Sequence, residues 1–346
     1  MKHMSGVILT GHGGPECLEW RDDLAVPKPL AGEVLIRVGA SAVNNTDINT
    51  RVGWYSKGDG ADDAAWTGEA LQFPRIQGID VCGRIVAVGD GVDPARIGER
   101  VLVEPCLLEA RGRTLDQPWF LGSECDGGFA EYVTVASRHA HVITSDLDDG
   151  ELASFACSYS TAENMIERSR VAAGERVLIT GASGGVGSAA IQLVQARGAV
   201  PIAVTSPGKE ASLREIGAQE TVLRDAVPAE ALGAGSVDVV LDLVGGPAFP
   251  GLLDVLRPRG RYAVSGAVGG PVVDLDLRTL YLKDLTLVGA TVLDPAVFPN
   301  LIAHIEAGRI RPLVGARFPL REIAKAQEVF AAKTYTGKIV LDVEGA

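Results

Sequence analysis

The 346-residue sequence lacks several features that would place a protein in a special class. No apolar run approaches the roughly 18 to 20 residues that a membrane-spanning helix needs, and the polar first residues show no signal-peptide pattern. The five cysteines are widely spaced and form no C-x-x-C pair, so neither a disulfide framework nor a compact zinc ribbon is indicated. These absences predict a cytoplasmic protein without a membrane partner.

Positive charge is also scarce. Lysine and arginine number 32 against 44 aspartate and glutamate residues, which gives a net charge of −12. An acidic surface disfavours nucleic acid as a partner, but it is compatible with a local basic site for a small anionic ligand. Hydrophobic residues make up 47% of the chain, which is enough for a sizeable core, and the length favours two domains.

The pattern of apolar residues changes before the midpoint of the chain. In the first part, short alternating segments such as 33–43 are separated by Gly, Pro, Asn and Asp, which is typical of an all-β barrel or sandwich. In the second part, apolar strands such as 176–180 alternate with helical segments, which predicts βαβ units and a parallel sheet. We therefore expect one domain over 1–150 and another over 151–293, with 294–346 completing either of them.

A glycine-rich turn links the apolar strand 177–180 to a helix that opens at Gly185. It departs from the G-x-G-x-x-G pattern only at the first glycine position, where Ala182 stands. A strand, a Gly-rich turn and a helix in this order are the context of a dinucleotide-binding fingerprint, although a turn without a ligand is the alternative. Gly184 would let the backbone approach a pyrophosphate, and Gly187 would let the helix pack close to the sheet. The residues expected to contact the cofactor are Gly181, Ala182, Ser183, Gly184, Gly185, Val186 and Gly187.

The end of the next strand predicts which dinucleotide binds. A carboxylate at this place normally binds the ribose 2′-hydroxyl of NAD, but here Thr205 is followed by Ser206-Pro207-Gly208-Lys209. The Ser206 hydroxyl and the Lys209 ammonium would suit a 2′-phosphate through charge-assisted hydrogen bonds. The sequence therefore favours NADPH over NADH, and the alternative is that Lys209 is a solvated residue of the first helical turn.

Four segments resemble the medium-chain dehydrogenase/reductase superfamily, and they occur in its order along the chain. They are Ile97–Val101, Gly127–Tyr132, the fingerprint 181–187 and the terminal Gly337–Leu341. The Ala-x-Gly-x-x-Gly form of the fingerprint is most similar to that of the quinone oxidoreductase branch. The resemblance implies an α/β fold with a GroES-like β-barrel catalytic domain over 1–150, completed by 294–346. It also implies a Rossmann domain, a doubly wound parallel sheet that binds NADP, over 151–293.

The resemblance also bears on metal binding. Zinc members of the superfamily hold a catalytic ion with Cys, His and Cys, and the matching positions here are Asn44, Ile79 and Cys157. Because isoleucine cannot ligate a metal and catalytic zinc requires three protein ligands, we expect no catalytic zinc. An atypical metal site is the alternative, with ligands drawn from Asp80, Cys157, Glu124 and Asp126.

Without a metal, hydrogen-bond donors would have to polarise the acceptor. The resemblance implies this role for Asn44, since the zinc-free branch has Asn at that position, and for Thr46, which matches the superfamily's proton-relay hydroxyl. A tyrosine of that branch falls at Asn49, so Tyr159 is the nearest replacement phenol in the sequence. Thr161 matches a position that contacts the nicotinamide ring. Turn or helix capping by Asn44 and Thr46, and core packing by Tyr159, are the structural alternatives.

Three further expectations concern the surroundings of the site. In the aperiodic stretch 53–73, Trp54, Tyr55 and Trp66 would shape an apolar pocket for the acceptor. Gly266 would join the residues that contact the cofactor. The apolar strand 285–292 would pair edge to edge with a second copy, which predicts a homodimer.

The leading hypothesis is a zinc-independent, NADPH-dependent oxidoreductase. It would pass a hydride to a quinone or to the β-carbon of an α,β-unsaturated carbonyl, so its partner is a small-molecule substrate. Asn44 and Thr46 would stabilise the developing enolate or quinolate oxygen, and Tyr159 or water would supply the proton. An alcohol dehydrogenase of the zinc type and a nucleotide-binding protein without turnover are the two alternatives.

Overall fold

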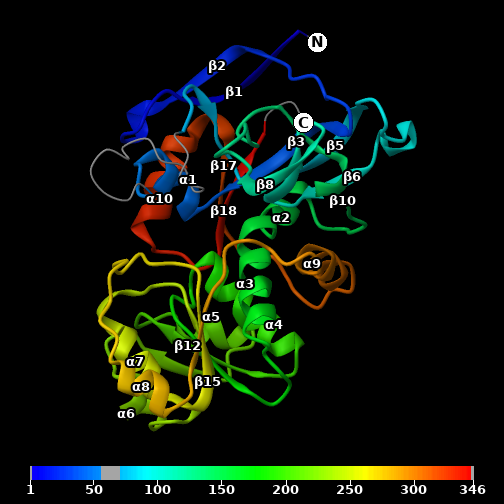
Figure 1. Ribbon diagram of the computed structural model, residues 1–346. Helices are drawn as coiled ribbons and strands as arrows, with labels where there is room; N and C mark the ends of the chain where they lie inside the picture. The colour runs from blue at the N-terminus through cyan, green and yellow to red at the C-terminus, as the bar shows by residue number, and fades with distance from the viewer. Residues whose placement is uncertain (1, 56–70, 344–346) are drawn as a thin grey trace. The chain divides into compact units, whose positions relative to one another are not determined.

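The computed structural model describes residues 2–55 and 71–343 of the chain. These residues form two compact units, and each is described by itself (Figure 1). The first unit consists of Met1–Cys157, Pro312–Thr334 and Lys338–Ala346, and the second of Ser158–Arg311 and Tyr335–Gly337. Trp66 lies outside the described residues.

Residues 294–311 belong to the second unit, although the resemblance placed them in the first domain. The reason is visible at Asn164, which lies on α3 (Ala156–Arg168). Its side-chain oxygen accepts the backbone N–H of Asp294 at 3.3 Å. This contact ties the segment that leads into α9 (Val297–Glu306) to a helix of the second unit.

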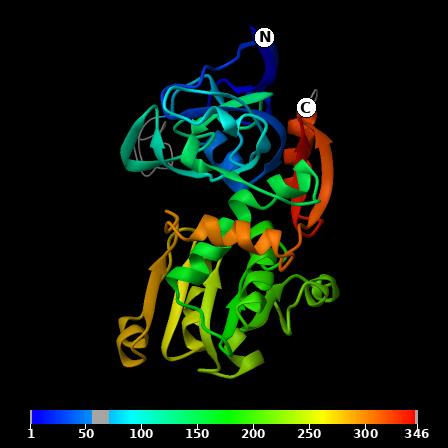
Figure 2. The same cartoon turned by 90° about the vertical axis from the view of Figure 1, so that its right-hand side faces the viewer.

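The strand β3 (Glu33–Val43) is the centre of the first unit. It pairs antiparallel with β5 (Cys82–Val88), with β9 (Tyr132–Ala136) and with β18 (Lys338–Asp342). Most of its side chains are buried, as expected for a strand with neighbours on both edges and a core on both faces. Figure 2 shows the red C-terminal strands beside the blue and cyan strands of this unit. The pairing of β18 with β3 therefore places the start of β18 beside the end of β3.

Other strands complete this sheet and form two smaller ones. The large sheet also contains β6 (Arg100–Val103), β10 (Ala140–Val142) and β17 (Val314–Pro319). The smaller sheets are formed by β1 (His3–Leu9), β2 (Leu18–Ala25) and β4 (Arg75–Ile76), and by β7 (Cys106–Ala110) and β8 (Arg113–Phe120). Helices of the unit include α1 (Asn45–Arg51), α2 (Asp149–Ala153) and α10 (Ile323–Ala332). The short helix α1 directly follows β3, so it begins where β18 pairs with that strand.

The second unit alternates strands and helices, as the sequence pattern predicts. Its strands are β11 (Arg176–Ile179), β12 (Val200–Thr205), β13 (Glu220–Leu223), β14 (Val237–Asp242), β15 (Leu256–Val264) and β16 (Thr286–Gly289). Its further helices include α4 (Gly185–Ala196), α5 (Glu210–Glu215), α6 (Pro228–Leu232), α7 (Phe249–Asp254) and α8 (Leu277–Leu282). Within residues 2–55 and 71–343, no helix combines the length and the apolar character needed to cross a bilayer.

These strands form a doubly wound parallel sheet. The order is β13-β12-β11-β14-β15-β16, and each neighbouring pair is parallel. Figure 1 shows α3 and α4 on one side of this sheet and α7 and α8 on the other. The direction of winding reverses between β11 and β14, and ligands of such sheets bind at the carboxyl ends of the strands at this reversal.

Candidate functional site

The glycine-rich turn lies at this reversal, between β11 and α4. Gly181 has a φ of +58°, a conformation that glycine adopts without strain. A Cβ atom on Gly187 would lie 2.4 Å from the carbonyl oxygen of Gly181, so only glycine lets α4 start this close to β11. Gly184 caps the helix without a side chain that occupies its first N–H groups. The turn therefore leaves a helix N-terminus available to a phosphate.

Ala182 explains why the first glycine of the fingerprint can be replaced. Its side chain is fully buried, and its backbone N–H donates to the carbonyl oxygen of Val204 at 3.2 Å. The next residue, Ser183, accepts the backbone N–H of Gly337 at 3.2 Å through its carbonyl oxygen. The methyl group of Ala182 thus packs into the core and leaves the approach to the turn unchanged.

A buried carboxylate that sequence reasoning missed holds three strand ends together beside this turn. Asp242, at the end of β14, accepts hydrogen bonds from the hydroxyls of Thr180 and Tyr262, both at 2.5 Å. The backbone N–H of Val244 donates to it at 2.9 Å. Burial and the neighbouring Asp242 raise the pKa of the Tyr262 phenol. In the sequence, the signal for this group of side chains was that polar residues stand at the ends of successive apolar strands.

Gly266 follows β15 on the same edge of the sheet. A Cβ atom there would lie 2.6 Å from the carbonyl oxygen of Leu243, so this position requires glycine for packing. Gly266 also lines a mainly apolar cavity of about 290 Å³, together with Phe249 and Tyr262. The position is compatible with the expected cofactor contact, and that contact stays a prediction.

Two cationic residues lie in the segments next to the end of β12, where the sequence predicts the 2′-phosphate. Ser206 follows the strand directly, and Lys209 precedes α5 with its ammonium 3.0 Å from the carbonyl oxygen of Tyr335. Desolvation lowers the pKa of Lys209. Arg224, which the sequence analysis missed, follows β13 and donates its backbone N–H to Thr205 at 2.8 Å. A second cationic residue therefore lies beside the same strand end, and its exposed guanidinium is 3.6 Å from the carboxylate of the adjacent Asp225.

Tyr159 and Thr161 both lie on α3 in the second unit. The Tyr159 hydroxyl donates to the carbonyl oxygen of Arg311 at 2.7 Å and accepts from the Gln192 amide at 2.9 Å. Burial raises the pKa of this phenol. Since both partners belong to its own unit, these contacts favour the packing alternative for Tyr159. Thr161 is half-buried, and its expected contact with the nicotinamide ring stays a prediction.

Asn44 and Thr46 lie together in the first unit, where β3 passes into α1. The backbone N–H of Asn44 donates to the Asp47 carboxylate at 2.9 Å, which caps the helix. Thr46 is in the first turn, and its hydroxyl oxygen accepts the phenol proton of Tyr55 at 3.2 Å. Sequence reasoning placed Tyr55 only in the pocket wall, yet Tyr55 is the phenol that contacts the predicted relay hydroxyl.

The Asn44 side chain belongs to a closed ring of three buried groups. Its amide nitrogen donates to Asp80 Oδ2 at 2.8 Å, and its amide oxygen accepts from the Lys338 ammonium at 2.5 Å. The ammonium also lies 2.8 Å from Asp80 Oδ2. The amide nitrogen is 3.3 Å from the carbonyl oxygen of Ala42 as well. The structure thus gives both N–H groups of this amide partners within the unit, instead of the acceptor oxygen that the resemblance implies.

Asp47 carries the electrostatic signature of this region. Its side chain is buried, and burial raises its pKa to about 7. The Asp80 carboxylate raises this pKa further, whereas hydrogen bonds from the backbone and the Lys338 charge oppose the rise. A carboxyl group that titrates near neutral pH is more frequent at functional sites than elsewhere.

The atypical metal site finds no support in the described residues. Among residues 2–55 and 71–343, no three His, Cys, Asp or Glu side chains gather as metal ligands would. Asp80 accepts the backbone N–H of Cys157 at 2.7 Å. Glu124 accepts the backbone N–H of Phe120, and Asp126 pairs with Arg75 at 2.8 Å. These carboxylates therefore hold backbone or cations in separate places.

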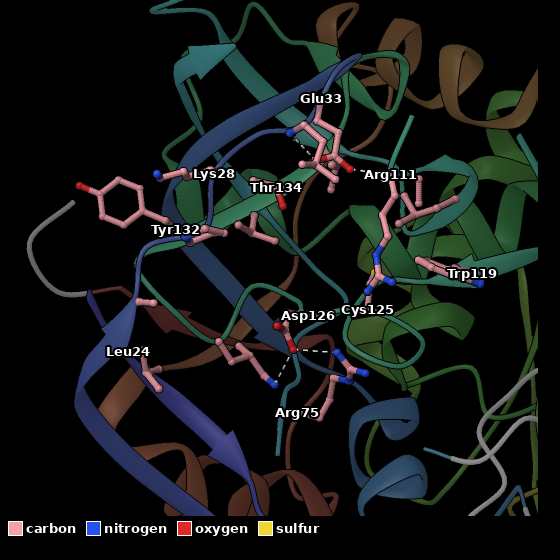
Figure 3. Close-up of a pocket in the computed structure, with 18 of the residues that line it drawn as sticks. Leu24, Lys28, Glu33, Arg75, Arg111, Trp119, Cys125, Asp126, Tyr132 and Thr134 are labelled. Carbon is pink, nitrogen blue, oxygen red and sulfur yellow. Dashed lines mark hydrogen bonds and ion pairs between the residues drawn. The ribbon is translucent and has the colours of Figure 1, made fainter. Parts of the chain in front are cut away.

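The Arg75–Asp126 pair borders a cavity of about 450 Å³ in the first unit (Figure 3). Its walls combine apolar side chains, such as Leu24 and Trp119, with charged ones. Figure 3 also shows Arg111 and Trp119 in the wall of the cavity, and the Arg111 guanidinium lies 5.2 Å from the centroid of the Trp119 ring. The residues of the Asn44 ring do not line this cavity, so it is separate from them.

Known protein families match both parts of this chain. The family model for an alcohol dehydrogenase GroES-like domain matches residues 30–145, and that for a zinc-binding dehydrogenase matches 185–307. The human protein named quinone oxidoreductase is 30% identical over 355 residues, which cover 98% of each chain. The chain belongs to the quinone oxidoreductase branch of the medium-chain dehydrogenase/reductase superfamily. The GroES-like and Rossmann architectures expected from the sequence are thereby confirmed.

Other members of the superfamily are also similar over nearly the whole length of the chain. Acryloyl-coenzyme A reductase of Metallosphaera sedula is 32% identical over 352 residues, covering 98% of this chain and 99% of that protein. A crystal structure of a putative alcohol dehydrogenase from Sinorhizobium meliloti is 52% identical, with a TM-score of 0.92. It covers 99% of this chain and 98% of that one. As a medium-chain dehydrogenase/reductase, this protein is an oxidoreductase that uses a nicotinamide cofactor.

Proposed function

We propose that this dehydrogenase/reductase uses NADPH to reduce a quinone or the β-carbon of an α,β-unsaturated carbonyl, without catalytic zinc. The observation that carries the proposal is the Thr46–Tyr55 hydroxyl pair beside an Asn44 side chain that is held by Asp80 and Lys338. A hydroxyl pair can stabilise and protonate an anionic oxygen, which is what the reduction of a conjugated carbonyl requires.

The bound cofactor would supply the hydride, and the chain's own residues would do the rest. The N-terminus of α4, opened by Gly184 and Gly187, would bind the pyrophosphate. Ser206, Lys209 and Arg224 would bind the 2′-phosphate, because cations and a hydroxyl suit a phosphate better than a ribose hydroxyl. These residues support NADPH over NADH.

The acceptor would be polarised from the first unit. Because Tyr55 donates its phenol proton to the Thr46 oxygen, the Thr46 hydroxyl proton is directed to another acceptor. We assign that acceptor as the carbonyl oxygen that becomes negative on reduction. The proton would then pass from Thr46 to the oxygen, the phenol proton of Tyr55 would replace it, and water would return a proton to Tyr55. In this scheme Asn44 shapes the site through its ring, and Tyr159 has no chemical role.

Zinc independence rests on the residues at the three ligand positions. Asn44 bonds Asp80 and Lys338, Ile79 is an apolar core residue, and only Cys157 keeps a ligand type. A single thiolate would not hold a catalytic zinc ion.

One assay tests the acceptor class and the metal together. NADPH absorbance is followed with a simple benzoquinone and with an acryloyl thioester, in parallel samples with and without a strong chelator. We expect turnover that the chelator does not change. Loss of turnover after chelation would contradict zinc independence. An absence of turnover with both acceptors would contradict the proposed reaction.

The similarity to a putative alcohol dehydrogenase supports a second candidate, the oxidation of alcohols with NADP⁺. The same preparations are therefore incubated with NADP⁺ and a series of primary and secondary alcohols. Turnover with alcohols alone would favour this second candidate, and we expect none at rates comparable with those for the benzoquinone.

We also propose that the protein is a homodimer, and a cytoplasmic location stays a prediction. The strand β16 ends the parallel sheet, and apolar side chains in and just before it are exposed, including Leu287 at 37% and Leu282 at 71%. Exposed apolar side chains beside a free strand edge favour association of two copies. Light scattering on a size-exclusion column tests this proposal, and a monomer would contradict it.

A further inference from the structure

Lys338 is a charged residue to which the proposed reaction gives no task of its own. It opens β18, its side chain is only 3% exposed, and its ammonium contacts both Asp80 and Asn44. Burying charges costs free energy, and a buried ion pair seldom stabilises a fold more than apolar side chains of similar size. Stability alone is therefore a poor explanation of this pair.

The Lys338–Asp80 pair is more deeply buried than other ion pairs of its unit. Its two side chains are 3% and 0% exposed, whereas those of Arg75–Asp126 are 10% and 57% exposed and those of Arg317–Asp148 are 38% and 53% exposed. Within residues 2–55 and 71–343, the Lys338 ammonium bonds two side-chain oxygens and no backbone oxygen. The hydrogen bonds of this ammonium therefore orient two side chains, those of Asn44 and Asp80.

The ring selects one orientation of the Asn44 amide. A lysine ammonium only donates hydrogen bonds and an ionised carboxylate only accepts them. The amide must therefore turn its oxygen to Lys338 and its nitrogen to Asp80, as the distances of 2.5 and 2.8 Å show. Because Asn44 also caps α1 through its contact with Asp47, this orientation is coupled to the helical turn that carries Thr46.

The positive charge reaches the same turn. Lys338 opposes the rise in the pKa of Asp47 that burial and the Asp80 carboxylate cause. Burial raises the pKa of the Tyr55 phenol, and the charge of Asp47 adds to this rise. Lys338 is thus a buried cation that acts on this turn.

We propose that Lys338 is a positioning residue of the acceptor site. Its ammonium fixes the Asn44 amide through the ring with Asp80, and it supplies the buried positive charge that favours a negative oxygen next to Thr46. This inference rests on the proposed function, in which Thr46 donates to that oxygen.

The test uses a variant in which both charges are removed. Lys338→Met alone leaves the Asp80 carboxylate buried without its cation, which is expected to destabilise the fold. The double variant D80N/K338M leaves no buried charge in the ring, so it is the form on which turnover is measured. Lys325→Met is the matched control, because Lys325 is an exposed lysine of α10 that pairs with Glu322 at 3.3 Å.

In the double variant, kcat with a benzoquinone is expected to fall about 10- to 100-fold, as when an electrostatic contribution to a transition state is removed. The melting temperature and the Kd of NADPH stay close to those of the wild type. Turnover stays unchanged in Lys325→Met. Wild-type turnover in D80N/K338M would overturn the proposal. It would mean that the ion pair serves only the structure, because a fold without either buried charge needs no charged partner at this place. Lys338→Arg, which keeps the charge, is expected to retain turnover within a few-fold, and a loss as large as in D80N/K338M would contradict the electrostatic role.

A second readout does not depend on turnover. The titration of Asp47 is followed by carbon NMR of aspartate-labelled protein, with Asp47→Asn to assign its signal. In Lys338→Met the pKa of Asp47 is expected to rise above the wild-type value, because the opposing charge is lost. An unchanged titration would overturn the electrostatic part of the inference. If the wild type reduces no acceptor, the proposed function fails, and this titration still tests the influence of Lys338 on α1.

Discussion

The glycine-rich turn of the second, Rossmann unit and the ring of three buried groups in the first, GroES-like unit differ in how far apart their residues lie in the sequence. The turn uses consecutive residues, from Gly181 to Gly187, between one strand and the next helix. The ring joins Asn44, Asp80 and Lys338, whose three pairs are 36, 258 and 294 positions apart. The turn depends on local backbone geometry, whereas the ring depends on the pairing of β18 with β3. We therefore expect substitutions in the two places to fail in different ways.

The largest effect is expected at Gly187. In Gly187→Val, the new side chain would begin 2.4 Å from the carbonyl oxygen of Gly181, so α4 would have to move away from β11. We expect NADPH binding to weaken at least about 100-fold and the melting temperature to fall, since overpacking typically costs about 1–3 kcal/mol. Binding is measured by the fluorescence of NADPH.

Gly251→Ala is the matched control for this change. Its Cβ atom would meet no neighbour closer than 4.0 Å, so binding and stability should match the wild type. If Gly187→Val bound NADPH with wild-type affinity, the turn would tolerate a side chain at this position. The close approach of α4 to β11 would then not require glycine.

This difference in sequence separation decides which of the two places the sequence alone could predict. The turn was predictable because a strand, Gly-x-x-Gly spacing and a helix lie next to one another, and each glycine has a local reason. The roles of Asn44 and Thr46 came from resemblance, and the ring itself was out of reach. Nothing near Lys338 in the sequence signals that its ammonium meets Asp80, because only sheet pairing brings them together. Tyr55 was assigned to the pocket wall because its contact with Thr46 depends on how the chain turns after α1.

The second prediction concerns the pH dependence of stability in the GroES-like unit. The pKa of Asp47 is about 7 in the fold, above the value of about 4 for an unfolded aspartate. The folded protein therefore binds this proton more tightly, and the resulting stability is present below pH 4 and lost as the pH rises to about 7. Relative to Asp47→Asn, the wild-type free energy of unfolding should fall by on the order of 4 kcal/mol across that window.

Urea unfolding at several pH values measures this difference. The Asp47→Asn variant serves as the reference because it cannot titrate at this position. Parallel curves for the two proteins between pH 4 and pH 7 would show that Asp47 stays ionised in the fold and that its burial is relieved by its neighbours.

The third prediction tests the hydroxyl of Thr46. Thr46→Val keeps the shape of the side chain and removes the group that Tyr55 contacts. We expect kcat to fall about 100-fold, as for the loss of one donor to a developing oxyanion, while the Kd of NADPH stays unchanged. Thr46→Ser keeps the hydroxyl and should retain most activity. A Thr46→Val variant with wild-type kcat would remove Thr46 from the mechanism.

The smallest effect is expected at the 2′-phosphate. Lys209→Ala and Arg224→Ala each remove one cation beside the end of β12, and each should raise the KM for NADPH about tenfold, equivalent to roughly 1.4 kcal/mol. The KM for NADH should stay unchanged, because NADH has no phosphate at this position. Arg214→Ala is the matched control, since Arg214 lies at the end of α5 and bonds the Thr221 hydroxyl at 3.0 Å. An equal rise in KM for both dinucleotides would mean that these cations support the strand end and do not read the phosphate. The two units would then differ less than we expect, because the cofactor preference of the second unit would also depend on packing and not on the type of residue at these positions.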